Sequence, residues 1–240
     1  DPEALSLRWY KYMIGYFSED VVSSTVPCST KWMKGTVNSF YIGIIATVIA
    51  TALGTLAALG LSRPHMPYKG LIMAILISPM IVPLIITAAG MFFFYARINL
   101  VYTFTGVILA HVALATPFVV ITVTATLVGF DMNMVKAAQS LGAKPMRTFF
   151  KVIMPLILPG IISGALFAFI TSFDEVVIVM FMASIDQLTI PKQMWAGIRQ
   201  EISPVILCMA TCLVLLSIFL LTTVELLRRR SEKLRGIKAR

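Results

Sequence analysis

The chain has 240 residues, of which 58% are hydrophobic and 13% are charged, and its formal net charge is +9. A soluble domain carries about 25% charged residues, so the composition excludes an ordinary soluble protein and indicates an integral membrane protein. Seven basic residues are concentrated in residues 228–240, directly after an apolar run. Because such a cluster fixes orientation and contacts anionic lipid, we expect a lipid membrane and no nucleic acid as its partner.

Five apolar runs predict an all-α, polytopic membrane bundle. Four of them contain no charged residue over more than the roughly 20 positions that a membrane helix needs, and the fifth is interrupted only by Asp174 and Glu175. Backbone groups in lipid must bond within their own segment, so the runs are expected to be helices. We place the helices at about 37–61, 71–95, 104–128, 156–183 and 205–227. Internal prolines are expected to act as hinges or as fixed kinks, and they are Pro79, Pro83 and Pro117.

The first 35 residues precede these runs and mix apolar with charged positions. Aromatic and apolar residues recur there at helical spacing, which predicts an external amphipathic segment over 1–35. Residues 36–227 are then the transmembrane domain, and 228–240 are a basic tail.

A polar stretch over 130–155 separates the third and fourth helices. Asp131 can cap a short helix, Gly142 suits a left-handed stop, and Pro145 suits the first position of a second helix. A helix over 131–141 is about 16 Å long, too short to cross a bilayer. It therefore either packs on another protein or lies on the membrane. Its predicted apolar face consists of Met134, Ala137, Ala138 and Leu141.

The distribution of Lys and Arg predicts the orientation. Thirteen of them lie in the 62–70 loop, the polar stretch and the tail, whereas seven lie on the other side. The positive-inside rule places the polar stretch and the carboxyl terminus in the cytoplasm.

Asp174 and Glu175 are the strongest candidates for the substrate path. Because a carboxylate inside a span is unfavourable, it usually faces water or a cation. Two acids suit a cationic solute, and the alternative is a structural pair bonded to backbone or to a basic residue.

Other candidates for the path also have structural alternatives. Thr171 and Ser172 line the path or bond to their own helix. Trp195 stacks on a cation or anchors the interface. Glu201 guides cations or is a solvated acid, and His111 lines the path or bonds a neighbouring helix.

Several motifs resemble one transporter family. Ala137, Ala138, Gly142 and Pro155 match the E-A-A-x3-G-x9-I-x-L-P loop of ABC importer permeases, with Lys136, Val152 and Met154 departing from it. The runs Leu5–Tyr10, Ser172–Val177 and Met194–Arg199, together with Glu201–Pro204, resemble the spermidine/putrescine branch.

The resemblance implies a type I importer fold with five of the usual six helices, the first being absent, in a bacterial inner membrane. It implies a second permease (as a hetero-dimer), two ATPases and a soluble binding protein. The residues of this chain that would couple it to the ATPase are Lys136, Ala137, Ala138, Leu141, Gly142 and Pro145.

No phosphate-binding G-x4-G-K-[ST] loop occurs in the chain. We therefore expect a transport subunit that is not an enzyme and carries no cofactor or metal, with ATP and Mg²⁺ on the partner ATPase. The expected solute is polyamine-like. The alternative solute is an amino acid or an opine-like compound. The alternative functions are a secondary transporter or channel subunit, which would need inverted repeats, and a structural membrane scaffold.

Overall fold

The computed structural model describes residues 9, 10, 13, 30–63, 65–128, 133–200 and 204–234, and the regular structure in these ranges is helical throughout. Within these ranges, four helices are long and apolar enough to cross a membrane, and a bent pair of helices raises the number to five if it forms one span. The all-α, polytopic prediction is confirmed.

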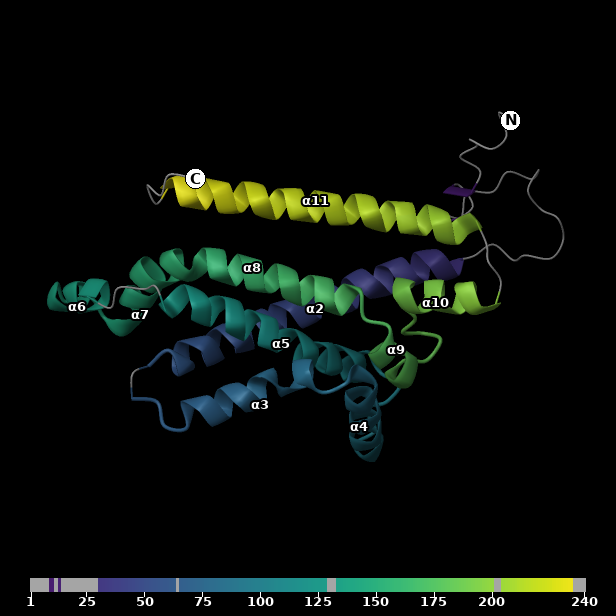
Figure 1. Cartoon of the computed structure of the whole chain (residues 1–240), viewed down its shortest axis with the longest axis horizontal. Helices are drawn as coiled ribbons and strands as arrows, with labels where there is room; N and C mark the ends of the chain where they lie inside the picture. Colours follow the sequence, from purple (N-terminus) through teal and green to yellow (C-terminus); the bar gives the residue numbers. More distant parts are fainter. Residues whose placement is uncertain are drawn as a thin grey trace.

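Three long helices form the centre of the bundle. They are α2 (Thr30–Leu61), α5 (Phe104–Val128) and α8 (Met154–Phe173), and they make the most extensive contacts in the molecule. Figure 1 shows them side by side along the long axis. Each is apolar around its whole circumference, as expected for a helix with protein on one side and lipid on the other. The predicted helices at 37–61 and 104–128 are confirmed.

Small residues bring these three helices close together. A Cβ atom on Gly54 of α2 would lie 2.6 Å from the Cβ of Val119 on α5, so a larger residue cannot fit there. A Cβ on Gly164 of α8 would lie 3.0 Å from the Cα of the same Val119. In membranes, where the hydrophobic effect gives little drive for association, such close backbone packing holds helices together.

The predicted single helix over 71–95 is wrong. The chain forms α3 (Lys69–Ile81) and α4 (Leu84–Arg97), with a bend of 104° at the break. Pro83 has no N–H and disfavours the helical conformation in the residue before it, and Val82 is indeed extended at φ −72° and ψ 134°. Pro79 and Pro117, by contrast, remain inside α3 and α5.

The predicted single helix over 156–183 is also wrong. It divides into α8 and α9 (Val177–Met182). A continuous helix would bond the N–H of Ile178 to the carbonyl of Asp174, but that N–H donates instead to Glu175 Oε1 at 2.9 Å. The side chain therefore competes with the helical bond and starts a new helix.

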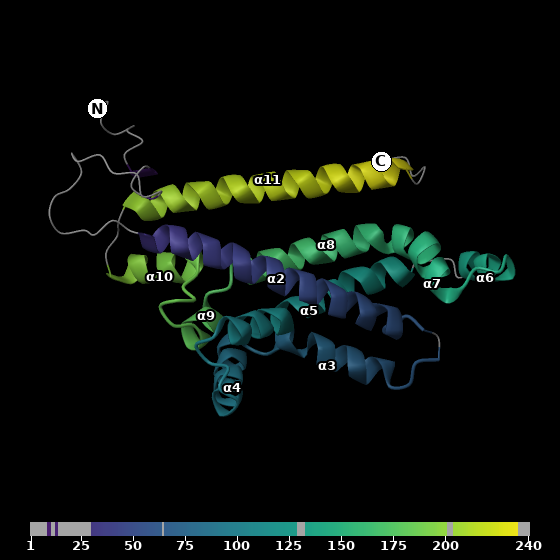
Figure 2. The same ribbon diagram turned by 180° about the vertical axis from the view of Figure 1, so that it is seen from behind.

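The remaining helices lie at the two ends of the bundle or along its side. α10 (Ile190–Gln200) contains Met194 and Trp195. α11 (Pro204–Leu234) extends the predicted helix at 205–227 and runs beside α8 (Figures 1 and 2). α6 (Asn133–Ser140) and α7 (Pro145–Thr148) lie at the end of the bundle where α2 and α11 finish, opposite α9 and α10. A π-helical turn, η3 (Phe149–Ile153), joins α7 to α8.

Candidate functional site

The turn after α6 has the geometry that its sequence predicts. Gly142 has a φ of +79°, and its N–H donates to the carbonyl of Gln139 at 2.9 Å. The N–H of Ala143 donates to the carbonyl of Ala138 at 3.0 Å. These two bonds form a Schellman motif, which satisfies carbonyls that the helix end would leave unpaired. The predicted left-handed stop at Gly142 and the start of α7 at Pro145 are both confirmed.

α6 projects from the end of the bundle, and most of its surface is uncovered. Its main contacts are with α7 and η3, which follow it directly in the chain. Leu141 is 88% exposed, and Met134, Lys136 and Ala137 are also exposed. Val135 and Ala138 are half-buried, so the predicted four-residue apolar face is divided, with Ala138 turned toward the chain. The helix thus offers a mixed small, apolar and cationic surface. The predicted cap Asp131 lies outside the described residues.

The two adjacent acids occupy different environments at the break between α8 and α9. Asp174 is the C-cap of α8 and is exposed. Glu175 is only 8% exposed, and it accepts the backbone bond from Ile178. The predicted alternative of a structural carboxylate therefore describes Glu175, whereas Asp174 is exposed.

A buried polar contact lies next to this break. His111 Nδ1 on α5 and Ser172 Oγ on α8 are 2.7 Å apart, and both side chains are buried. Of the alternatives predicted for His111, the structure therefore shows the bond to a neighbouring helix. Ser172 bonds across to α5 instead of to its own helix. The contact holds the carboxyl end of α8 against α5, one residue before this helix ends at Phe173.

In the part of the chain that the structure describes, no side-chain hydrogen bond or ion pair joins the other predicted path residues to Asp174 or Glu175. Thr171 is half-buried on α8, and Trp195 is 48% exposed on α10. Glu201 lies outside the described residues.

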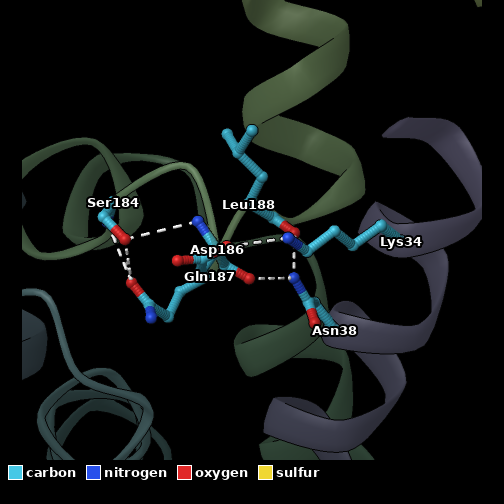
Figure 3. Close-up of polar contacts among 6 residues, drawn as sticks. All are labelled: Lys34, Asn38, Ser184, Asp186, Gln187 and Leu188. Atoms are coloured by element: carbon cyan, nitrogen blue, oxygen red, sulfur yellow. Dashed lines mark hydrogen bonds and ion pairs between the residues drawn. The ribbon is translucent and has the colours of Figure 1, made fainter. Parts of the chain in front are cut away.

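Sequence reasoning missed a polar lock between α2 and the loop over 184–189, which Figure 3 shows. Asn38 Nδ2 donates to the carbonyls of Asp186 and Leu188 at 2.8 and 2.9 Å. Lys34 Nζ and Asp186 Oδ1 form an exposed ion pair at 2.8 Å. Within the loop, Gln187 Oε1 accepts bonds from the N–H and the hydroxyl of Ser184. The only available signal was a polar Asn38 at the start of an apolar helix, and it did not identify a partner about 150 positions away.

Lys192 on α10 holds the neighbouring α9 in place. Its Nζ donates to the carbonyls of Val179 and Ala183 at 3.1 and 3.0 Å, at the carboxyl end of α9. Cations stabilise this end of a helix because the last carbonyls have no intrahelical partner. Burial lowers the pKa of Lys192 from its ordinary value. The orientation prediction counted Lys192 only as one of the seven basic residues on the external side.

Comparison with known families decides what this bundle is. The family described as "Binding-protein-dependent transport system inner membrane component" matches residues 37–233. The chain belongs to this family. It is therefore a multi-pass membrane permease of a binding-protein-dependent transport system, and it acts in transport and not as an enzyme.

Two curated relatives come from polyamine systems. The spermidine/putrescine transport system permease protein PotC of Haemophilus influenzae is 28% identical over 230 residues, covering 96% of this chain and 84% of the relative. The putrescine transport system permease protein PotI of Escherichia coli is 28% identical over 214 residues, covering 86% and 71%.

Among solved structures, an inward-facing MetNI methionine ABC transporter superposes with a TM-score of 0.63. It shares 19% sequence identity, and the match covers 89% of this chain and 100% of the other. At this identity the likeness establishes the fold: this permease has the bundle of an ABC transporter membrane subunit.

Proposed function

We propose that this permease forms half of the import path for a small cationic, polyamine-like solute and that a cytoplasmic ATPase drives it through α6. The observation that carries the proposal is the uncovered α6 and its Schellman turn at Gly142. A short helix that makes its main contacts only with the next turns of its own chain is suited to the helix-in-groove mode of recognition. Ala137 and Leu141 would enter the groove, and Pro145 would start the return toward the bundle.

The ends of the molecule support an orientation with α6 in the cytoplasm. The amino end of α3, which begins at Lys69, and α7, which contains Arg147, lie at the same end of the bundle as α6 and the carboxyl end of α11 (Figure 1). Basic residues predominate in these segments. The lock between α2 and the 184–189 loop would then face the outside, where a soluble binding protein delivers its cargo.

The contacts provide a route from α6 to the path. Force applied to α6 passes through α7 and η3 directly into α8, because these elements are continuous in the chain. At its far end, α8 is tied to α5 by His111 and Ser172. Closure of the ATPases would therefore displace α8 and α5 together and alter the break at Asp174.

The exposed carboxylate of Asp174 supports a cationic solute. A carboxylate forms charge-assisted hydrogen bonds with an ammonium group, which are about twice as strong as neutral ones. The polyamine relatives support the same solute class. One chain of this size does not enclose a path, so the assembly needs a second permease, which we propose is a different chain. Two ATPases would hold the ATP and Mg²⁺.

Uptake into proteoliposomes tests the substrate. The permease is reconstituted with its second permease and ATPases, with ATP inside the vesicles, and binding protein and radiolabelled solute are added outside. The panel contains spermidine, putrescine, an opine and an uncharged sugar. We expect uptake of the two amines to exceed that of the sugar at least tenfold. Preferential uptake of the opine or the sugar would contradict the polyamine proposal.

A further inference from the structure

The described residues that run from α6 to the start of α8 carry charge of one sign. Residues 133–155 contain four basic residues and no acidic residue. All four basic side chains are exposed, and they are Lys136, Lys144, Arg147 and Lys151. Exposed apolar side chains lie among them, including Met146 at 71% and Phe150 at 57% exposure. A surface of this kind combines apolar anchors with a net positive field.

Lys136 is the basic residue that lies on α6 itself, within residues 133–140. With about 100° between successive residues, Lys136, Ala137 and Ser140 fall within about 100° of the helix circumference. This arc points away from the half-buried Val135 and Ala138. The cation therefore lies on the same outward side as the small residue Ala137.

Nothing within the described part of the chain neutralises Lys136. The ion pair between Lys34 and Asp186 joins the first turns of α2 to the loop before α10, at the opposite end of the bundle from α6. The dipole of α6 does not account for Lys136 either, because this residue is the fourth of eight and the dipole acts mainly on charges in the first and last turns. Its charge is thus available to a second molecule.

We propose that Lys136 selects an ATPase whose docking groove carries a carboxylate opposite it. This inference rests on the proposed function, because it assumes that α6 docks on an ATPase. Complementary charges across an interface mainly determine partner choice and association rate, whereas like charges facing each other disfavour the wrong partner. The acid-free surface over 133–155 therefore fits an acidic groove and rejects a basic one.

The test measures binding of the ATPase that supports uptake with the wild-type chain. The full permease is placed in nanodiscs of phosphatidylcholine alone, so that anionic lipid is excluded. We expect Lys136→Glu to weaken binding at least tenfold and Lys136→Gln to weaken it less. Salt should weaken wild-type binding more steeply than binding of either variant. Replacing one groove acid of the ATPase by Lys should restore binding of Lys136→Glu.

Lys69→Glu is the matched control. Lys69 is exposed and begins α3, whose amino end lies at the same end of the bundle as α6, but it is outside residues 133–155. We expect it to change binding less than twofold. Gly142→Pro separates the two proposals, because it disrupts the turn that presents α6. If Gly142→Pro abolishes binding while Lys136→Glu binds like wild type, the charge inference is wrong and the docking proposal stands.

Two other outcomes are decisive. Wild-type binding by both Gly142→Pro and Lys136→Glu would remove the docking proposal and the inference together. The same binding measurement is repeated in nanodiscs that contain phosphatidylglycerol. If Lys136→Glu weakens ATPase binding only there, Lys136 contacts lipid headgroups, and the proposed selection of an acidic ATPase groove is wrong.

Discussion

Asp174 and Glu175 are neighbours in the chain, but their surroundings give them different roles. Glu175 is buried and holds the amino end of α9 through its bond to Ile178. Asp174 is exposed at the end of α8. An unpaired carboxylate at a break between two helices can contact a passing cation, whereas a carboxylate that already accepts a backbone bond is committed to structure.

Asp174→Asn should therefore weaken transport of the cationic solute. We expect the KM for spermidine uptake to rise about tenfold, equivalent to about 1.4 kcal/mol, because an amide does not attract an ammonium group as a carboxylate does. Asp186→Asn, the same chemical change at an exposed acid outside the proposed path, should leave the KM unchanged. If Asp174→Asn and Glu175→Gln both preserve uptake and solute-stimulated ATP hydrolysis, neither acid lines the path.

The lock in Figure 3 allows a comparison of two neighbouring residues. Asn38→Ala should destabilise the permease by about 1–3 kcal/mol, because two loop carbonyls lose a buried donor. Lys34→Ala should change stability by less than about 1 kcal/mol, since both partners of its ion pair are exposed. Thermal unfolding in detergent measures both effects, and an equal loss in the two variants would show that Asn38 does not secure the loop.

At the scale of the elements, sequence reasoning succeeded where a single physical property decides the outcome. Long charge-free runs must be helical in lipid, and α2, α5 and α11 cover the predicted ranges. It failed at the breaks after Ile81 and Phe173. Pro79, Pro83 and Pro117 all lie within long apolar runs of the sequence. Of these three prolines, Pro83 alone interrupts a helix. Whether a proline ends a helix therefore depends on the packing around it, which the sequence of one run does not specify.

In the candidate sites, too, local features were predictable from the sequence and long-range contacts were not. The turn at Gly142 is local, and the spacing of Gly142 and Pro145 was enough to predict it. The contact of His111 with Ser172 joins positions 61 residues apart, and Asn38 bonds positions about 150 residues away. Such long-range partners depend on how the helices assemble, which the pattern within one helix does not specify.

The Schellman turn yields a prediction about coupling. Gly142→Ala should destabilise the turn by about 1–2 kcal/mol because φ is positive there, and it should lower solute-stimulated ATP hydrolysis. Gly142→Pro and Ala138→Glu should abolish that stimulation while the membrane helices still fold. Stimulated hydrolysis is measured in proteoliposomes, and circular dichroism checks the helix content. Full stimulation in Gly142→Pro and Ala138→Glu would show that α6 does not couple ATP hydrolysis to transport.

At the scale of the whole molecule, α6 and α10 lie at opposite ends of the bundle (Figures 1 and 2). Labelling of single cysteines tests which end is cytoplasmic, in a chain whose Cys28, Cys208 and Cys212 are replaced by Ser. Ile185→Cys, at a position that is 78% exposed in wild type, should react with an impermeant maleimide in intact cells. Gln139→Cys should react only after permeabilisation. The reverse pattern would invert the proposed orientation.

The energy source of uptake tests the central claim most directly. Proteoliposomes containing the complete assembly are given radiolabelled spermidine and binding protein outside, with ATP, a non-hydrolysable ATP analogue or an ion gradient as the energy source. A permease driven through α6 should accumulate spermidine only with hydrolysable ATP. Accumulation driven by the ion gradient without ATP would contradict this account and identify the chain as part of a secondary transporter.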